Sequence, residues 1–174
     1  MKPHLGYRVL VVMERDPASP GLIQAVVNHG SDLTKRHFTL LCCCPAMYWE
    51  HGGGASTAGA IQVAQELAQV DAHYERATEI ANEVLTTAAN MLREAGVRED
   101  HITTRTCFEA DSLIEAIYRE LRAQIYSTVV IDQRQRKAIR RLTKRGIWKW
   151  FLPYIPEVDV WAVDVEELEV QAVL

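Results

Sequence analysis

The most conspicuous group of chemically capable residues in this chain is a run of positive charge. Residues 134–145, here called the basic segment, carry seven Lys and Arg side chains and no carboxylate. The formal net charge of the whole chain is -4, so the rest of it is strongly acidic. A local basic run on an acidic chain is typical of contact with a specific anion or an acidic partner. The seven residues are Arg134, Arg136, Lys137, Arg140, Arg141, Lys144 and Arg145.

Three interpretations of the basic segment remain open from the residues alone. It could bind a phosphate-type ligand, because guanidinium groups donate paired hydrogen bonds to phosphate oxygens. It could dock an acidic protein, or a nucleic acid, although the negative charge of the whole chain makes nucleic acid the weaker of these two partners. It could also be a solvated helix face, with Ile139 and Leu142 turned inward.

The cysteines do not form a pattern that predicts chemistry. Cys42, Cys43 and Cys44 are consecutive, and neighbouring residues of a strand point to opposite faces, so a simple disulfide framework with Cys107 is not expected. Cys42, Cys44 and His51 match no established zinc spacing, and we expect no metal. Reduced thiols used as small apolar residues are typical of a cytoplasmic protein.

Other function classes lack their sequence signals. No apolar run approaches the roughly 18 residues of a membrane span. The chain has no Ser-His-Asp order, no HExxH motif and no nucleophile elbow. We therefore expect a soluble protein without catalytic residues, in which weak nucleotide hydrolysis is the only enzymatic activity to consider.

The elements that must position these residues follow an alternating order. Five short runs predict strands, and most are apolar without alternation, which is the pattern of a parallel sheet. Helical patterns lie between them, and the order predicts a three-layer α/β/α sandwich with a five-stranded parallel sheet. The 174 residues suit a single domain, 1–174, with a loop and helix extension around 46–70. The predicted strands are 7–13, 37–44, 102–108, 127–131 and 158–163.

Two details of this layout can be checked against the structure. The helical pattern over 60–95, ended by Gly96, would be roughly 50 Å long at about 1.5 Å per residue. Because that exceeds a small domain, we expect a break or a projecting first part before about Asp71. Asp16 with Ser19 is a candidate cap for the first helix. The residues after 163 are interpreted as an acidic tail.

With these elements in place, the chain resembles the universal stress protein superfamily over nearly its whole length. Residues 9–19 resemble that family's first strand and the turn after it. Residues 91–97 resemble the end of its second helix, and residues 109–117 resemble its segment after the third strand. Residues 129–131 resemble its fourth strand. The resemblance implies an adenine-nucleotide-alpha-hydrolase-like topology.

The chain departs from the family at the loop that binds nucleotide. Nucleotide-binding members carry Gly-x2-Gly-x9-Gly-Ser/Thr after the fourth strand, where glycines let backbone N–H groups approach phosphates. Here Asp132, Gln135 and Arg145 stand at the glycine positions, and Gly146 stands where Ser or Thr belongs. The acidic residue that contacts the nucleotide in such members matches Glu14. We therefore expect no ATP binding in the family's usual way.

The resemblance also implies a role and an assembly. We expect a regulatory or interaction domain, without cofactor, that forms a homodimer through its last strand. The alternative is an adenine-nucleotide-binding stress protein, holding ATP or AMP on an arginine-based phosphate site. A third reading is an interaction module that uses the basic segment. The residues of the alternative nucleotide site would be Glu14, Val130, Arg134, Arg136, Arg145 and Gly146. The expected dimer contact comprises Val158, Val160, Trp161 and Val163.

Overall fold

The computed structural model describes residues 5–16, 18–44, 59–108, 113–135 and 158–173. Its single sheet has the strand order β3-β2-β1-β4-β5-β6. The first five strands in sequence are mutually parallel, as predicted. They are β1 (Arg8–Glu14), β2 (His37–Cys43), β3 (Ile102–Cys107), β4 (Thr128–Asp132) and β5 (Asp159–Asp164).

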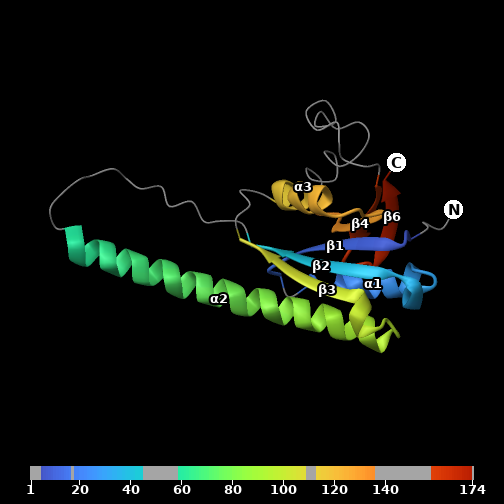
Figure 1. The fold of residues 1–174 in the computed structure, drawn as a ribbon, viewed down its shortest axis with the longest axis horizontal. Coiled ribbons are helices and arrows are strands. Elements are labelled where there is room, and N and C mark those ends of the chain that lie inside the picture. The colour runs from blue at the N-terminus through green and yellow to red at the C-terminus, as the bar shows by residue number, and fades with distance from the viewer. Residues whose placement is uncertain (1–4, 17, 45–58, 109–112, 136–157, 174) are drawn as a thin grey trace, which may run out of the picture.

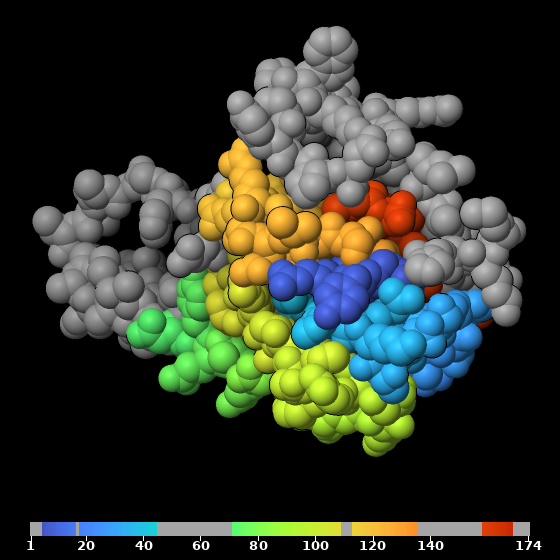
Figure 2. Space-filling view, turned by 45° about the vertical axis from the view of Figure 1, so that its right-hand side comes forward, coloured from blue at the N-terminus to red at the C-terminus, as the bar shows by residue number. Residues whose placement is uncertain are grey.

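Helices cover both faces of this sheet, which confirms the three-layer arrangement (Figure 1). One face packs against α1 (Gly21–His29) and α2 (Gly59–Glu94), and the other packs against α3 (Leu113–Ala123). The space-filling view separates the layers, with orange α3 residues on one side and light-blue and green residues on the other (Figure 2). Two short 3-10 turns, Leu33–Lys35 and Glu99–His101, precede β2 and β3.

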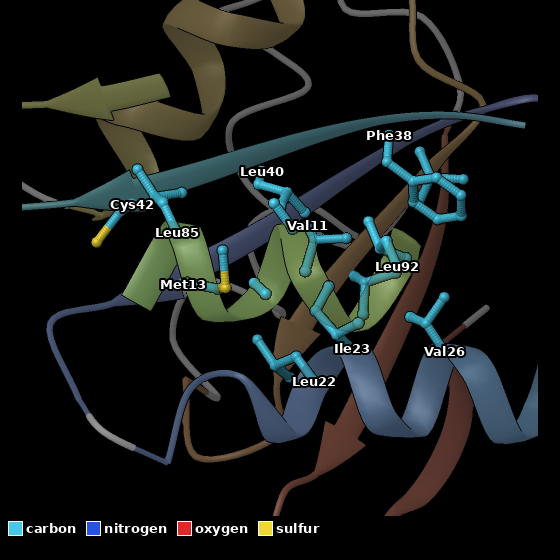
Figure 3. Packing of buried hydrophobic residues seen from close by; sticks show 14 of the residues in the cluster. Val11, Met13, Leu22, Ile23, Val26, Phe38, Leu40, Cys42, Leu85 and Leu92 are labelled. Atoms are coloured by element: carbon cyan, nitrogen blue, oxygen red, sulfur yellow. The ribbon is translucent and has the colours of Figure 1, made fainter. Parts of the chain in front are cut away.

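Two apolar clusters hold the layers together. The larger lies between the sheet and the α1–α2 layer, where Met13, Ile23 and Leu92 are fully buried (Figure 3). The smaller lies under α3 and includes Ile117 and Ile131. The central strands are buried on both faces because helices cover both, and this explains their continuous apolar sequence.

Helix α2 is continuous and its first part extends away from the sheet, as expected (Figure 1). Its 36 residues make it about 54 Å long at 1.5 Å per residue. Residues 71–76 are exposed, and burial begins at Ala77. The predicted end at Gly96 is confirmed, because Gly96 has φ +88° and Val97 N–H donates to Leu92 O at 3.0 Å. This pairing is the Schellman arrangement, which favours glycine.

The prediction for the end of the chain was wrong. The residues after β5 include a sixth strand, β6 (Glu169–Val173), which pairs antiparallel with β5. The turn between them is held by Asp164, whose Oδ1 accepts the N–H of Glu166 at 3.0 Å. Leu168 completes it with φ 53°, and its carbonyl contacts His29 Nε2 at 3.1 Å. A five-residue strand beside an acidic turn carries too weak a periodic signal to be recognised.

The capping prediction for α1 was also wrong. The residue before the helix is Pro20, and no side chain caps it. Asp16 instead folds over its own turn, where its Oδ1 accepts the N–H of Ala18 at 2.9 Å. Ser19 Oγ accepts the N–H of Glu14 at 3.3 Å. Both polar groups therefore stabilise the turn after β1, beside the candidate site.

Candidate functional site

The candidate site lies at the carboxyl ends of β1 and β4. These strands are neighbours at the centre of the sheet, and the chain continues from β1 to β2 and β3 on one side and from β4 to β5 on the other. In open α/β sheets, ligands bind in the crevice at such a switch in strand order. The strands end at Glu14 and Asp132, so the acidic position expected from the resemblance does face this edge.

Arg134 closes over this edge by bonding the last residue of β4. Its Nε and Nη2 donate to Asp132 Oδ2 at 2.8 and 2.5 Å. Nη2 also donates to Asp16 Oδ2 at 3.2 Å. The hydrogen bond and charge of Asp132 raise the pKa of the Arg134 guanidinium above its ordinary value. The first residue of the basic segment is therefore neutralised by two carboxylates of its own chain.

Gln135 closes the same edge from the side of β1. Its Nε2 donates to Glu14 Oε2 at 2.5 Å. In the resemblance, Gln135 stands at a glycine position and Glu14 at the acidic position that contacts nucleotide. Glycine has no side chain, so this hydrogen bond exists because Gln135 stands at that position. Its amide occupies the carboxylate oxygen that would otherwise be available to a nucleotide.

The backbone donors after β4 are also occupied. Gln133 N–H donates to Val163 O at 2.7 Å, and Gln135 N–H donates to Asp132 O at 2.9 Å. Arg134 N–H donates to Asp132 Oδ1 at 2.8 Å. A phosphate-binding loop works by leaving such N–H groups free to converge on an anion. Here three successive N–H groups bond within the chain.

Charge at this edge does not favour an anion. Among the described residues, this edge carries three carboxylates and two guanidinium groups. The carboxylates are those of Glu14, Asp16 and Asp132, and the guanidinium groups are those of Arg15 and Arg134. Asp132 is buried, whereas the Arg134 side chain is 52% exposed. A phosphate would approach three carboxylates, and to bind Arg134 it would have to displace Asp132, leaving a nearly buried carboxylate with fewer partners.

Of the other residues of the alternative nucleotide site, the structure describes Val130 alone. Val130 is fully buried in the cluster under α1 and α2, so its side chain belongs to the core. Arg136, Arg145 and Gly146 lie outside the described residues. The remaining basic residues, Lys137, Arg140, Arg141 and Lys144, lie outside them too.

The residues predicted for the dimer contact lie on β5 or next to it and pack within this chain. Val160, Trp161 and Val163 are buried within the chain, with at most 2% of their surface exposed. Val158 is half-buried and packs against the cluster under α3. The free edge of β5 is taken by β6. These four residues therefore stabilise this chain's own core, because helices cover both faces of β5 and β6 covers its edge.

The three consecutive cysteines lie at the end of β2 and are all buried. Cys42 and Cys44 belong to the cluster under α1 and α2, whereas Cys43 belongs to the cluster under α3. Burial raises the pKa of the Cys43 thiol. No group of three potential metal ligands occurs among the described residues, and His51 lies outside them. Also within the described part, no helix combines the length and apolarity that a bilayer span requires.

Comparisons with known proteins concern the fold. No protein-family model matches the sequence, and no curated protein matches it. A solved structure of a protein from the universal stress protein family of Burkholderia pseudomallei is similar at 15% identity and a TM-score of 0.46, covering 71% of this chain and 79% of that one. The solved structure of hypothetical protein PH0823 is similar at 13% identity and a TM-score of 0.45, covering 81% of this chain and 91% of that one. Both TM-scores lie below 0.5, and no ligand, role or assembly of this chain follows from these similarities.

Sequence reasoning missed the partners that close the edge. Asp16 was interpreted as a helix cap and Asp132 only as a replaced glycine, yet both bind Arg134. One signal was present, because Asp132 and Arg134 are two residues apart directly after a strand. An acidic residue there readily accepts hydrogen bonds from the turn that follows it.

Proposed function

We propose that this chain is a universal-stress-protein-like regulatory or interaction domain that does not bind adenine nucleotides in the usual way and has no catalytic site of its own. The observation that carries the proposal is the set of three occupied backbone N–H groups after β4. Because these three donors are bonded within the chain, this described part of the loop cannot bind a phosphate without being rearranged.

The side chains support the same reading. Arg134 and Gln135 add two hydrogen-bonded closures over the edge, to Asp132 and Glu14. Binding a triphosphate would require both closures to open and would bring negative charge next to three carboxylates. These costs oppose binding before any favourable contact forms.

Calorimetric titration with ATP and with AMP, each with and without Mg²⁺, tests the proposal. We expect no saturable heat below about 1 mM nucleotide, which corresponds to a binding free energy weaker than about -4 kcal/mol. Binding of either nucleotide with a micromolar dissociation constant would overturn the proposal. The double variant Arg134→Ala plus Arg136→Ala then identifies the arginine-based alternative, because that site would lose its salt-sensitive binding.

The basic segment provides the interaction surface in this proposal. The segment is positively charged, whereas the rest of the chain is acidic. This distribution of charge fits an acidic protein better than a nucleic acid. Arg134 contributes little, because it already pairs with two carboxylates. A pull-down with immobilised poly-glutamate and with single-stranded RNA separates the two partners, and we expect salt-sensitive retention on poly-glutamate alone.

A homodimer in the cytoplasm is the assembly and location we propose for this domain. Because β6 takes the edge of β5, a dimer formed at this end of the sheet would have to use β6. Native mass spectrometry of the purified chain measures the oligomeric state directly. A monomer at about 10 μM, a concentration at which a homodimer of micromolar affinity is well populated, would remove the homodimer from the proposal.

A further inference from the structure

A polar cavity of about 170 Å³ lies at the opposite end of the sheet from the candidate site. It is lined by the amino-terminal parts of β1, β2 and β3 and by the residues that follow α3. Figure 2 shows the start of the chain, in dark blue, at the surface beside the orange residues of this region. The lining includes Arg8, Thr39, Thr103, Arg105 and Tyr126, and it contains no carboxylate.

Register explains why these residues meet. Arg8 lies two residues before Leu10 on β1, and alternate residues of a strand point to the same face. Leu10 faces α3, so Arg8 projects on that face too. Thr39 pairs with Thr103 across β2 and β3, and Arg105 follows two residues later on the same face. The helix α3 ends at Ala123, short of these residues. The cavity therefore occupies the part of this face that α3 leaves uncovered.

The two guanidinium groups at the cavity have donors to spare. Arg8 is exposed and makes no side-chain hydrogen bond or ion pair with any described residue. Arg105 is exposed and, among the described residues, gives one bond, from Nη1 to Glu120 Oε2 at 3.1 Å. A guanidinium carries five N–H donors, so Arg105 retains most of them. Both side chains line the same cavity, so an anion bound in it would gain charge-assisted hydrogen bonds from guanidinium donors.

A buried network keeps the wall of the cavity in place. Glu120 is buried, and its Oε1 accepts the hydroxyl of Tyr126 at 2.5 Å. Both oxygens of Glu120 are thus bonded, and this carboxylate does not line the cavity. Burial, followed by the bond to Glu120, raises the pKa of Tyr126 to about 12, so the hydroxyl remains a donor. Arg105 is held in position by the same carboxylate.

One feature of the fold opposes an anion here. The carbonyl end of α3 lies beside Gln124, which lines the cavity, and a helix end of this kind carries about half a negative charge. Arg8 and Arg105 bring two full positive charges, of which Glu120 balances one. The balance remains positive.

We propose that this cavity binds a phosphate group, either as inorganic phosphate or as the terminal group of a small phosphomonoester. Arg8 and Arg105 supply the charge and Thr103 supplies a hydroxyl donor, whereas the hydroxyl of Thr39 already bonds Tyr126. The volume is below the roughly 300 Å³ at which pockets for whole small molecules begin, so a complete nucleotide does not fit. The proposal is independent of the proposed function, because the two regions lie at opposite ends of the strands.

Titration of the isotopically labelled full chain, followed by NMR at constant ionic strength, tests the site. One arm uses inorganic phosphate and the other uses glycerol phosphate, which separates the free ion from a monoester. We expect saturable shifts at the amides of His37, Thr39 and Thr103, with a dissociation constant on the order of 1 mM. The absence of saturable shifts at these amides in both arms would overturn the proposal.

Two variants make the test specific. Arg8→Gln removes a side chain with no partner among the described residues, so the fold should be retained, and we expect about tenfold weaker binding. Arg76→Gln removes the same charge from an exposed position on α2, outside the cavity lining, and should bind within about twofold of the wild type. Equal binding by the wild type and Arg8→Gln would contradict the site.

His37 provides a second readout. Burial and the nearby charges of His101, Arg8 and Arg98 lower its pKa, while Asp100 raises it. The ring also stacks on His101 at 3.9 Å and contacts Tyr7 Oη at 3.1 Å. Phosphate bound beside it would favour the protonated ring, so the pKa of His37 should rise in phosphate. An unchanged His37 titration at saturating phosphate would count against the site.

Discussion

Removing the Arg134 guanidinium tests the closed carboxyl edge of the sheet through stability. In Arg134→Ala, Asp132 loses two hydrogen bonds from the guanidinium and keeps the backbone N–H of residue 134. Asp16 loses its ion pair across the turn. Both effects act on the folded state only, so the free energy of unfolding should fall.

The magnitude follows from the burial of the two partners. Breaking a fully buried ion pair costs about 3–5 kcal/mol, and breaking an exposed one costs about 0–1 kcal/mol. The Asp132 side chain is 10% exposed and the Arg134 side chain is 52% exposed, so the pair lies between these limits. Water can reach the carboxylate once the guanidinium is gone. We expect a loss of about 1–2 kcal/mol, or roughly 3–6 °C in Tm for a chain of this size.

Urea unfolding followed by circular dichroism measures this loss. The matched control is Arg122→Ala, because Arg122 is exposed on α3 and bonds no described residue. It should change stability by less than about 0.5 kcal/mol. The difference in stability loss between Arg134→Ala and Arg122→Ala should shrink by roughly half in 1 M NaCl, where charges are screened over a Debye length of about 3 Å. Equal losses in Arg134→Ala and Arg122→Ala would refute the closed arrangement.

Three further predictions concern other residues. Tyr126→Phe removes the hydroxyl that bonds buried Glu120 and should lower the free energy of unfolding in urea by about 2 kcal/mol. Tyr74→Phe, at a 46% exposed position, is the control and should change it by almost nothing. Equal losses in the two variants would argue against the network. The pKa of Tyr126 in the folded chain is raised to about 12 from its ordinary 10, so the stability that its hydroxyl contributes should be intact below pH 10 and disappear as the pH rises toward 12. A stability difference between wild type and Tyr126→Phe that stayed constant over this range would contradict the prediction. In the native protein, half-buried Cys107 should react with a thiol reagent before Cys42 and Cys43, which are buried and whose pKa values are raised. Simultaneous reaction of these three thiols would mean that the end of β2 opens.

Much of the fold could be predicted from the sequence because its signals are local. The strands β1, β2 and β4 are buried on both faces, and this burial produces the apolar runs that predicted them. The length of α2 followed from its periodicity and from Gly96. Strand β6 was missed because it is short and depends on Asp164 and Leu168 to turn the chain.

The candidate site could be located but not described. The position of Glu14 after the first strand and the lost glycines identified the edge and its departure from the family. The hydrogen bond of Gln135 to Glu14 joins segments more than 100 residues apart, and the folding of Arg134 back onto Asp132 depends on the side-chain geometry of the turn. The phosphate cavity could not be predicted either, because Arg8 and Arg105 come to line one cavity only through the register of three strands.

The central claim is that the first three residues after β4, the described part of this loop, have no free backbone donors for a phosphate. An NMR titration of the labelled chain with Mg·ATP tests it most directly, since it reports the amides of Gln133, Arg134 and Gln135 one by one. We predict that these three signals stay in place through millimolar ATP. Saturable shifts of all three at micromolar ATP would contradict the account.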